Sequence, residues 1–80
     1  MKQVNVKYFA IFRELSGLEN EVVKTSAHTL GELYAELASG HGFRLPGHAV
    51  RASVDRRFVS MDRVLADGDE VVFIPPVAGG

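Results

Sequence analysis

The chain has 80 residues, of which 46% are hydrophobic, with no cysteine, no tryptophan and a formal net charge of -1. This length predicts one small domain, and the missing cysteines exclude a disulfide framework, a thiolate nucleophile and a cysteine-bound metal. Nine basic residues against ten acidic ones argue against a nucleic-acid-binding protein, which usually carries a basic excess.

The first part of the chain predicts a strand, a short helix and a second strand. Residues 4–9 alternate apolar and polar side chains, as expected of a strand with one buried face. Ile11 and Leu15 lie four residues apart and are followed by Gly17, which predicts one or two helical turns that end at a glycine. A second, short strand is expected over residues 21–25.

The strongest helix signal begins at Thr29, because Thr29 and Glu32 fit a capping box. An apolar stripe follows and predicts an amphipathic helix that ends at Gly40 and Gly42. Gly31 lies inside the first turn, where glycine costs about 1 kcal/mol relative to alanine, so we expect a closely packed neighbour there. The stripe consists of Leu30, Leu33, Tyr34, Leu37 and Ala38.

The C-terminal part again predicts strands. Residues 50–54 alternate, and residues 55–57 form a turn into a short strand at Phe58 and Val59. Residues 67–69, Asp-Gly-Asp, are interpreted as a turn rather than as a metal or acid pair. Residues 70–74 form a densely apolar last strand, which the following prolines stop.

This order of elements predicts an α+β fold of the ubiquitin-like β-grasp type. We expect a mixed sheet of four to five strands, with one main helix packed across one face and a short helix between the first two strands. The first and last strands are expected in the middle of the sheet because they are the most apolar. The predicted domain spans residues 1–74, and residues 75–80 form an extended C-terminal tail.

The tail is the most informative segment. Proline has no amide hydrogen, so Pro75 and Pro76 end the sheet pairing and direct the chain outward. Glycine has no Cβ, so Gly79 and Gly80 can enter a channel that is too narrow for other residues. We predict that Val77 and Ala78, with Pro75, Pro76 and Gly79, guide the carboxylate of Gly80 to a partner. The alternative is a frayed terminus without function.

The residues 67–80 resemble the ending of the small, sulfur-carrying subunits of molybdopterin synthase. The opening resembles that family too, over residues 6–10 and 12–17, and the similarity extends over essentially the whole chain, including residues 55–60. The two glycines alone would indicate only the wider group of ubiquitin-like carriers. Related carriers of the thiamine pathway share the glycines but are usually shorter and lack the short helix and the double proline.

The resemblance implies a sulfur carrier that is not an enzyme on its own. An E1-like adenylyltransferase would use ATP to convert Gly80 into an acyl-adenylate, and a sulfur donor with a persulfide would then leave a thiocarboxylate. The loaded tail would insert into the large synthase subunit, in a complex expected to hold two large and two small subunits. There the sulfur would pass to the cyclic pterin precursor, cyclic pyranopterin monophosphate. No cofactor or metal is expected to bind to the carrier itself.

Five further residues are candidates for the partner-facing surface. For Phe9 and Phe73 the alternative is a place in the core, and for Arg13 it is a solvated charge. Ile74 has the best position because it directly precedes the tail. The candidates are Phe9, Arg13, Phe58, Phe73 and Ile74.

Two other expectations follow from the sequence. The N-terminus lacks the apolar segment of a secretory signal and no apolar run could cross a bilayer, so we expect a cytoplasmic protein without a membrane partner. The scattered histidines His28, His41 and His48 are expected at the surface or in loops.

The alternatives for function are a sulfur carrier for thiamine or tRNA thiolation, a ubiquitin-like protein modifier, and a passive interaction domain.

Overall fold

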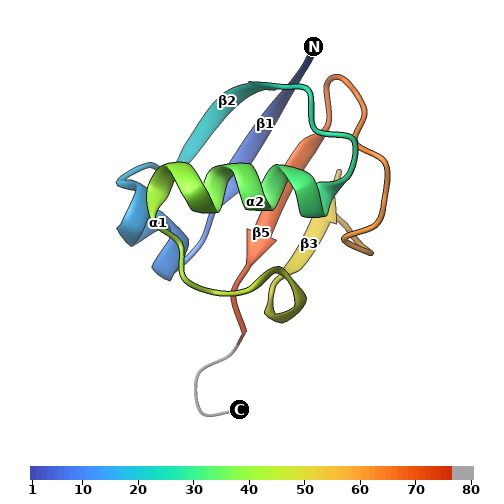
Figure 1. Ribbon diagram of the computed structural model, residues 1–80. Coiled ribbons are helices and arrows are strands. Elements are labelled where there is room, and N and C mark those ends of the chain that lie inside the picture. Colours follow the sequence, from blue (N-terminus) through green and yellow to red (C-terminus); the bar gives the residue numbers. More distant parts are fainter. Residues whose placement is uncertain (77–80) are drawn as a thin grey trace.

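The computed structural model describes residues 1–76, in which five strands form one sheet that a single long helix crosses (Figure 1). The strand order is β2-β1-β5-β3-β4; β1 and β5 are parallel, and the other neighbouring pairs are antiparallel. The predicted β-grasp arrangement is therefore confirmed, with the first and last strands inside the sheet. The elements are β1 (Lys2–Tyr8), α1 (Ile11–Ser16), β2 (Asn20–Thr25), α2 (Leu30–His41), the 3-10 helix η1 (Gly47–Ala49), β3 (Arg51–Val54), β4 (Arg57–Val59) and β5 (Glu70–Ile74).

The bounds of α2 follow from its caps. Thr29 Oγ1 accepts a hydrogen bond from the amide of Glu32 at 3.2 Å, which satisfies one of the free amides of the first turn. The Glu32 carboxylate accepts from the Thr29 hydroxyl, also at 3.2 Å, so it returns to the side chain rather than to the backbone amide that the capping box predicts. The helix continues past Gly40 and ends at Gly42, whose φ of 76° is left-handed. Of the two glycines predicted to end the helix, Gly42 is therefore its C-cap, whereas Gly40 lies within the last turn.

The core lies between α2 and one face of the sheet. In β1 only every second side chain is buried, as the alternation predicts. The predicted apolar stripe of α2 covers these strands, and α1 adds Phe12, which is fully buried. The largest buried side chains are Tyr8, Phe12, Phe73, Leu30, Leu33 and Leu65.

Two turns show why polar sequences connect the strands. Asp55 and Arg56 both have positive φ, 50° and 74°, and join β3 to β4 in a two-residue turn. In the turn before β5, Asp67 accepts a hydrogen bond from the amide of Gln3 at 2.7 Å, and Asp69 accepts one from the amide of Ala66 at 2.8 Å. The carboxylates thus fix the turn, which confirms the turn interpretation of these acidic residues.

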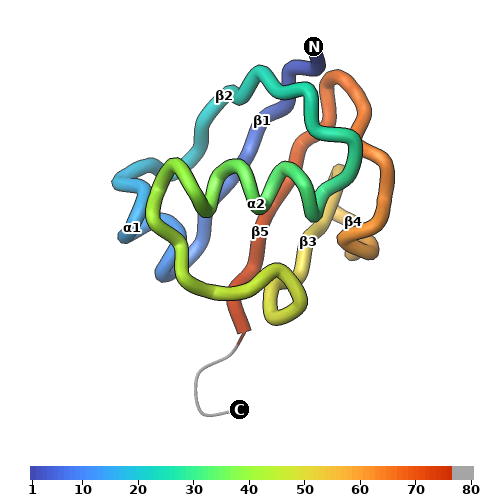
Figure 2. The backbone as a smooth tube through the Cα atoms, viewed as in Figure 1, coloured from blue at the N-terminus to red at the C-terminus, as the bar shows by residue number. Residues whose placement is uncertain are grey.

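The sheet topology determines where the chain leaves the domain. Because β1 and β5 run parallel, their C-terminal ends lie at the same end of the sheet. The smooth tube in Figure 2 shows that this end of the sheet lies opposite the N-terminus, and that the segment between α2 and β3 passes along it. The exit of the chain therefore lies beside the end of β1, the start of β3 and the segment after α2.

Candidate functional site

The candidate site is the place where the chain leaves β5. Ile74, the last residue of the strand, lies beside Arg51 of β3, and the half-buried Pro75 and the exposed Pro76 follow. These three residues, 74–76, are called the tail root below. The predicted reactive residue Gly80 and the predicted guide residues Gly79, Ala78 and Val77 lie outside the described residues.

The tail root continues a row of side chains on the sheet face that points away from α2, which we call the open face. Val71 and Phe73 of β5 are fully buried under α2, so alternation places Val72 and Ile74 on the open face. The register places Lys7 beside Val72 on β1 and Ser53 beside it on β3. Ser53 in turn pairs with Phe58 of β4, whose side chain is 71% exposed.

The predicted partner-facing residues fall into two groups. Phe9 directly follows β1 and is 48% exposed, so the alternative that places it in the core is wrong. Phe73 is fully buried, so the core alternative is right for it and we remove it from the candidates. Phe58 and Arg13 are exposed and Ile74 is half-buried. Of the remaining candidates, Phe9 and Phe58 flank the tail root from the β1 side and the β4 side.

A hollow of about 430 Å³ lies on the β3–β4 side of the tail root. Its wall combines apolar side chains with a cation, and Pro76 forms part of it. Sequence reasoning missed Arg51 in this hollow and Val72 on the open face because their places depend on which strands are neighbours. The lining residues are His48, Ala49, Val50, Arg51, Ala52, Phe58, Val59, Ser60, Met61 and Pro76.

Two cations on this surface, Lys7 and Arg51, have no ion-pair partner in the described part of the chain. Within residues 1–76 the ion pairs are His41–Glu21 and Arg63–Asp69, so neither Lys7 nor Arg51 takes part in one. Both side chains are exposed. The open face beside the tail root therefore offers an apolar centre, Val72 and Ile74, with an exposed positive charge on each side.

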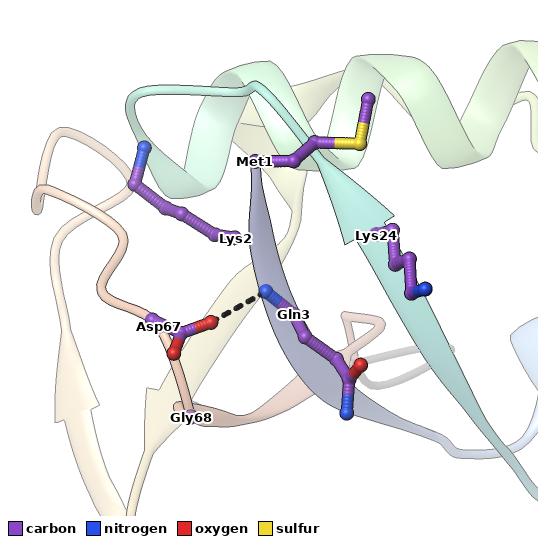
Figure 3. Close-up of a pocket in the computed structure, with 6 residues that line it drawn as sticks. All are labelled: Met1, Lys2, Gln3, Lys24, Asp67 and Gly68. Carbon is purple, nitrogen blue, oxygen red and sulfur yellow. Dashed lines mark hydrogen bonds between the residues drawn. The ribbon is translucent and has the colours of Figure 1, made fainter.

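A second hollow, of about 580 Å³, lies at the opposite end of the sheet (Figure 3). Lys2, Lys24 and Asp67 contribute to its wall, and the dashed line in the figure marks the bond from the Gln3 amide that occupies Asp67. Asp67 is the one acidic residue that lines this hollow, and its carboxylate is hydrogen-bonded within the turn, so the lining residues provide no acid–base pair. The hollow also lies at the other end of the sheet from the tail root.

Tyr8, Glu21 and His41 form a cluster of titratable side chains that holds three elements of the fold together. Glu21 Oε1 accepts from the hydroxyl of Tyr8 and lies 2.7 Å from Nε2 of His41. Burial first, and then the Glu21 carboxylate, raise the pKa of Tyr8 far above its usual value. The cluster joins β1, β2 and the last turn of α2. His41 is thus half-buried in the last turn of α2, whereas His28 and His48 are exposed, as expected.

Two negative findings concern residues 1–76. No group of three or more histidine and acidic side chains is placed so that it could hold a metal ion. No helix in this part of the chain is long and apolar enough to cross a membrane.

A mixed sheet crossed by one helix, with the chain leaving from a central strand through two prolines, defines a ubiquitin-like β-grasp protein. The sequence profile of the ThiS family matches residues 6–80. The chain belongs to the ThiS family.

Curated relatives support the same assignment. The chain is 36% identical to the molybdopterin synthase sulfur carrier subunit of Escherichia coli (strain K12), in an alignment that covers 96% of this chain and 99% of that protein. It is 38% identical to the protein of that name from Mycobacterium tuberculosis (strain ATCC 25618 / H37Rv), with both chains covered completely. The resemblance seen in the sequence is therefore confirmed.

Solved structures agree on the fold. A Pyrococcus furiosus protein described as molybdopterin converting factor, subunit 1, superimposes with a TM-score of 0.80 at 33% identity, covering 96% of this chain and all of that one. One chain of a structure described as the complex of subunits 1 and 2 of molybdopterin-converting factor from Helicobacter pylori 26695 matches with a TM-score of 0.65 at 28% identity, covering 98% of this chain and 99% of that chain. The small archaeal modifier protein 1 of Haloferax volcanii reaches a TM-score of 0.78 at 20% identity over 96% of this chain and all of that one, which shows the shared fold alone.

Proposed function

We propose that the chain is the sulfur carrier subunit of a molybdopterin synthase and that Gly80 carries the sulfur. The observation that supports this most strongly is the full-length similarity to sulfur carrier subunits, joined to a tail root that leaves a central strand. β5 is held by β1 on one side and β3 on the other, so the domain fixes the direction from which the tail starts.

The proposed chemistry begins at a carboxylate, which is a poor electrophile. A partner adenylyltransferase activates it: a Gly80 carboxylate oxygen attacks the α-phosphorus of ATP, and pyrophosphate leaves. The terminal sulfur of a donor persulfide then attacks the acyl carbon and AMP leaves. A thiol cleaves the resulting S–S bond, which releases the thiocarboxylate. Gly79 and Gly80 have no Cβ, which suits passage through a narrow channel in each partner.

In the second half of the cycle the carrier acts as a cosubstrate of the large subunit. The thiocarboxylate sulfur attacks a carbon of the cyclic pterin precursor and displaces an oxygen from it, and water then hydrolyses the resulting thioester, so that the sulfur stays on the pterin and Gly80 returns as a carboxylate. Residues of the large subunit supply the acid–base groups. Because a dithiolene has two sulfur atoms, two loaded carriers are consumed for each product. We further propose that the large subunit contacts the open face at Phe58 and Ile74 together with Phe9 and Arg13, in an assembly of two large and two small subunits.

Reconstitution tests this function. Carrier that has been loaded chemically with a thiocarboxylate at Gly80 is mixed with the purified large subunit and cyclic pyranopterin monophosphate, and the dithiolene product is quantified. We expect two equivalents of carrier to be consumed for each product. A loaded carrier that yields no product here, but restores a thiamine or tRNA-thiolation auxotroph, would refute the assignment and favour the other pathways.

A further inference from the structure

A separate groove lies between α1 and the segment that follows α2. It has a volume of about 350 Å³, and its wall is apolar except for one arginine. Phe12 forms part of the wall and belongs to the core, whereas Ile11 and Leu15 are 39% and 46% exposed. The lining residues are Ile11, Phe12, Leu15, Gly42, Arg44 and Leu45.

The fold itself does not account for the exposed side chains of this groove. A single residue of α1, Phe12, anchors the six-residue helix in the core. Ile11 and Leu15 lie four residues apart and therefore share one side of the helix, and both are exposed rather than part of the buried core cluster. Two large apolar side chains beside an apolar hollow are typical of a surface that another protein covers.

Charge indicates what kind of segment would fit. Arg44 in the wall and Arg13 on α1 are both exposed, and neither takes part in an ion pair within residues 1–76. Glu14 is the one carboxylate on α1, so the two arginines leave this surface with a positive excess. A partner segment that presents an apolar side chain next to carboxylates would complement both the wall and the charge.

The position of the groove indicates which partner would supply that segment. Phe9 lies at the end of the sheet where β1 and β5 end, and α1 begins two residues later, after its N-cap Ala10. The groove therefore begins two residues along the chain from Phe9, and Phe9 and Ile74 follow the paired residues Tyr8 and Phe73 on neighbouring strands. Any protein that receives the tail comes close to this end of the sheet.

We propose that the α1 groove is a docking site for an apolar and acidic segment of the large synthase subunit, in addition to the contacts of the open face. This inference rests on the proposed function, because it takes the large subunit as the partner. The groove side chains anchor the segment, and Arg44 pairs with a carboxylate beside it.

Binding of the purified large subunit to the full-length carrier, measured by calorimetry over a series of salt concentrations, tests the proposal. Leu15→Ser is expected to weaken binding about tenfold at every salt concentration, because it removes an apolar anchor. Arg44→Glu is expected to weaken binding about tenfold at low salt and less at high salt, because screening reduces charge effects. Leu15→Met should bind as the natural chain does.

The matched controls carry equivalent changes far from the groove. Val64 is 54% exposed and lies beside Thr29, at the start of α2, and Lys24 lines the hollow at the opposite end of the sheet. Val64→Ser and Lys24→Glu should bind within about twofold of the natural chain, as surface changes outside an interface do.

Each outcome has one meaning. If the natural chain does not bind the large subunit, the proposed function fails. If it binds and the groove variants bind as the controls do, the groove inference alone fails. Circular dichroism verifies that Leu15→Ser folds, and Arg44→Glu provides an independent test because its side chain is exposed. A carrier that dimerises through Leu15 would assign the groove to a second copy and would also overturn the proposal.

Discussion

Arg51 and Ile74 are direct neighbours across the pairing of β3 and β5, at the position where the chain leaves the sheet. The residue before the tail therefore has a cation beside it, and that cation forms no ion pair within residues 1–76. Whatever protein takes the tail meets this charge together with the apolar surface of Ile74.

From this arrangement we predict that Arg51→Glu slows association with the large subunit. Reversing an exposed charge at an interface mainly changes the association rate, here on the order of tenfold at low salt. Stopped-flow measurement at several salt concentrations gives the rate. Arg51→Lys, which keeps the charge, is the control, and equal rates for the Glu and Lys variants would contradict the prediction.

Two phenylalanines should respond in opposite ways. Phe58 is 71% exposed and Phe73 is fully buried. Phe58→Ser should change the free energy of unfolding by no more than about 0.5 kcal/mol but weaken partner binding, whereas Phe73→Ala should cost about 3–5 kcal/mol of stability. Chemical denaturation and calorimetry measure the two effects. A Phe58→Ser variant that unfolds as easily as Phe73→Ala would refute the assignment of Phe58 to the open face.

The turn between β3 and β4 should be improved by a glycine. Arg56 has a φ of 74°, a conformation that costs a residue with a Cβ roughly 1 kcal/mol. Arg56→Gly is expected to raise the free energy of unfolding by about 0.5–1 kcal/mol. The same change at Arg57, which lies in β4, should lower stability instead. Urea denaturation of both variants measures the difference, and two changes of equal sign would contradict it.

Stability should fall in alkaline solution because of the tyrosines. Burial raises the pKa of Tyr34, and burial together with Glu21 raises the pKa of Tyr8. As the pH rises above about 10, the unfolded chain releases these protons while the folded chain keeps them, so the free energy of unfolding decreases.

Tyr8→Phe provides the comparison for this pH effect. The variant loses the hydrogen bond to Glu21 and is expected to be less stable at neutral pH. Its stability should nevertheless decrease less steeply above pH of about 10, because one of the two perturbed groups is gone. Parallel unfolding curves for the two proteins from neutral to alkaline pH would show that Tyr8 does not titrate as proposed.

Local sequence signals were enough to predict the elements of this fold. Period-two alternation defined β1, the capping residue Thr29 defined the start of α2, and the double proline marked the end of β5. These features act over a few residues. The predicted place of β1 and β5 inside the sheet also held, because the strands that are buried most deeply are the most apolar.

The partner-facing surface depends on relations that local signals do not contain. Phe9 and Phe73 are both strand-associated phenylalanines, and only the register shows that one follows the end of β1 while the other lies under α2. The nearness of Arg51 to the tail root depends on β3 being the neighbour of β5. The ion pair of His41 with Glu21 joins two elements that are 20 residues apart in the chain.

The central claim is that Gly80 carries sulfur, and intact-mass measurement tests it most directly. The full-length chain is incubated with its adenylyltransferase, ATP and a persulfide donor, beside a variant that lacks Gly80. We predict that one oxygen is replaced by sulfur in the complete chain, that the change depends on ATP, and that peptide mapping places it on Gly80. Equal sulfur loading in the variant without Gly80, or lysine-linked Gly-Gly remnants in place of a thiocarboxylate, would contradict the account.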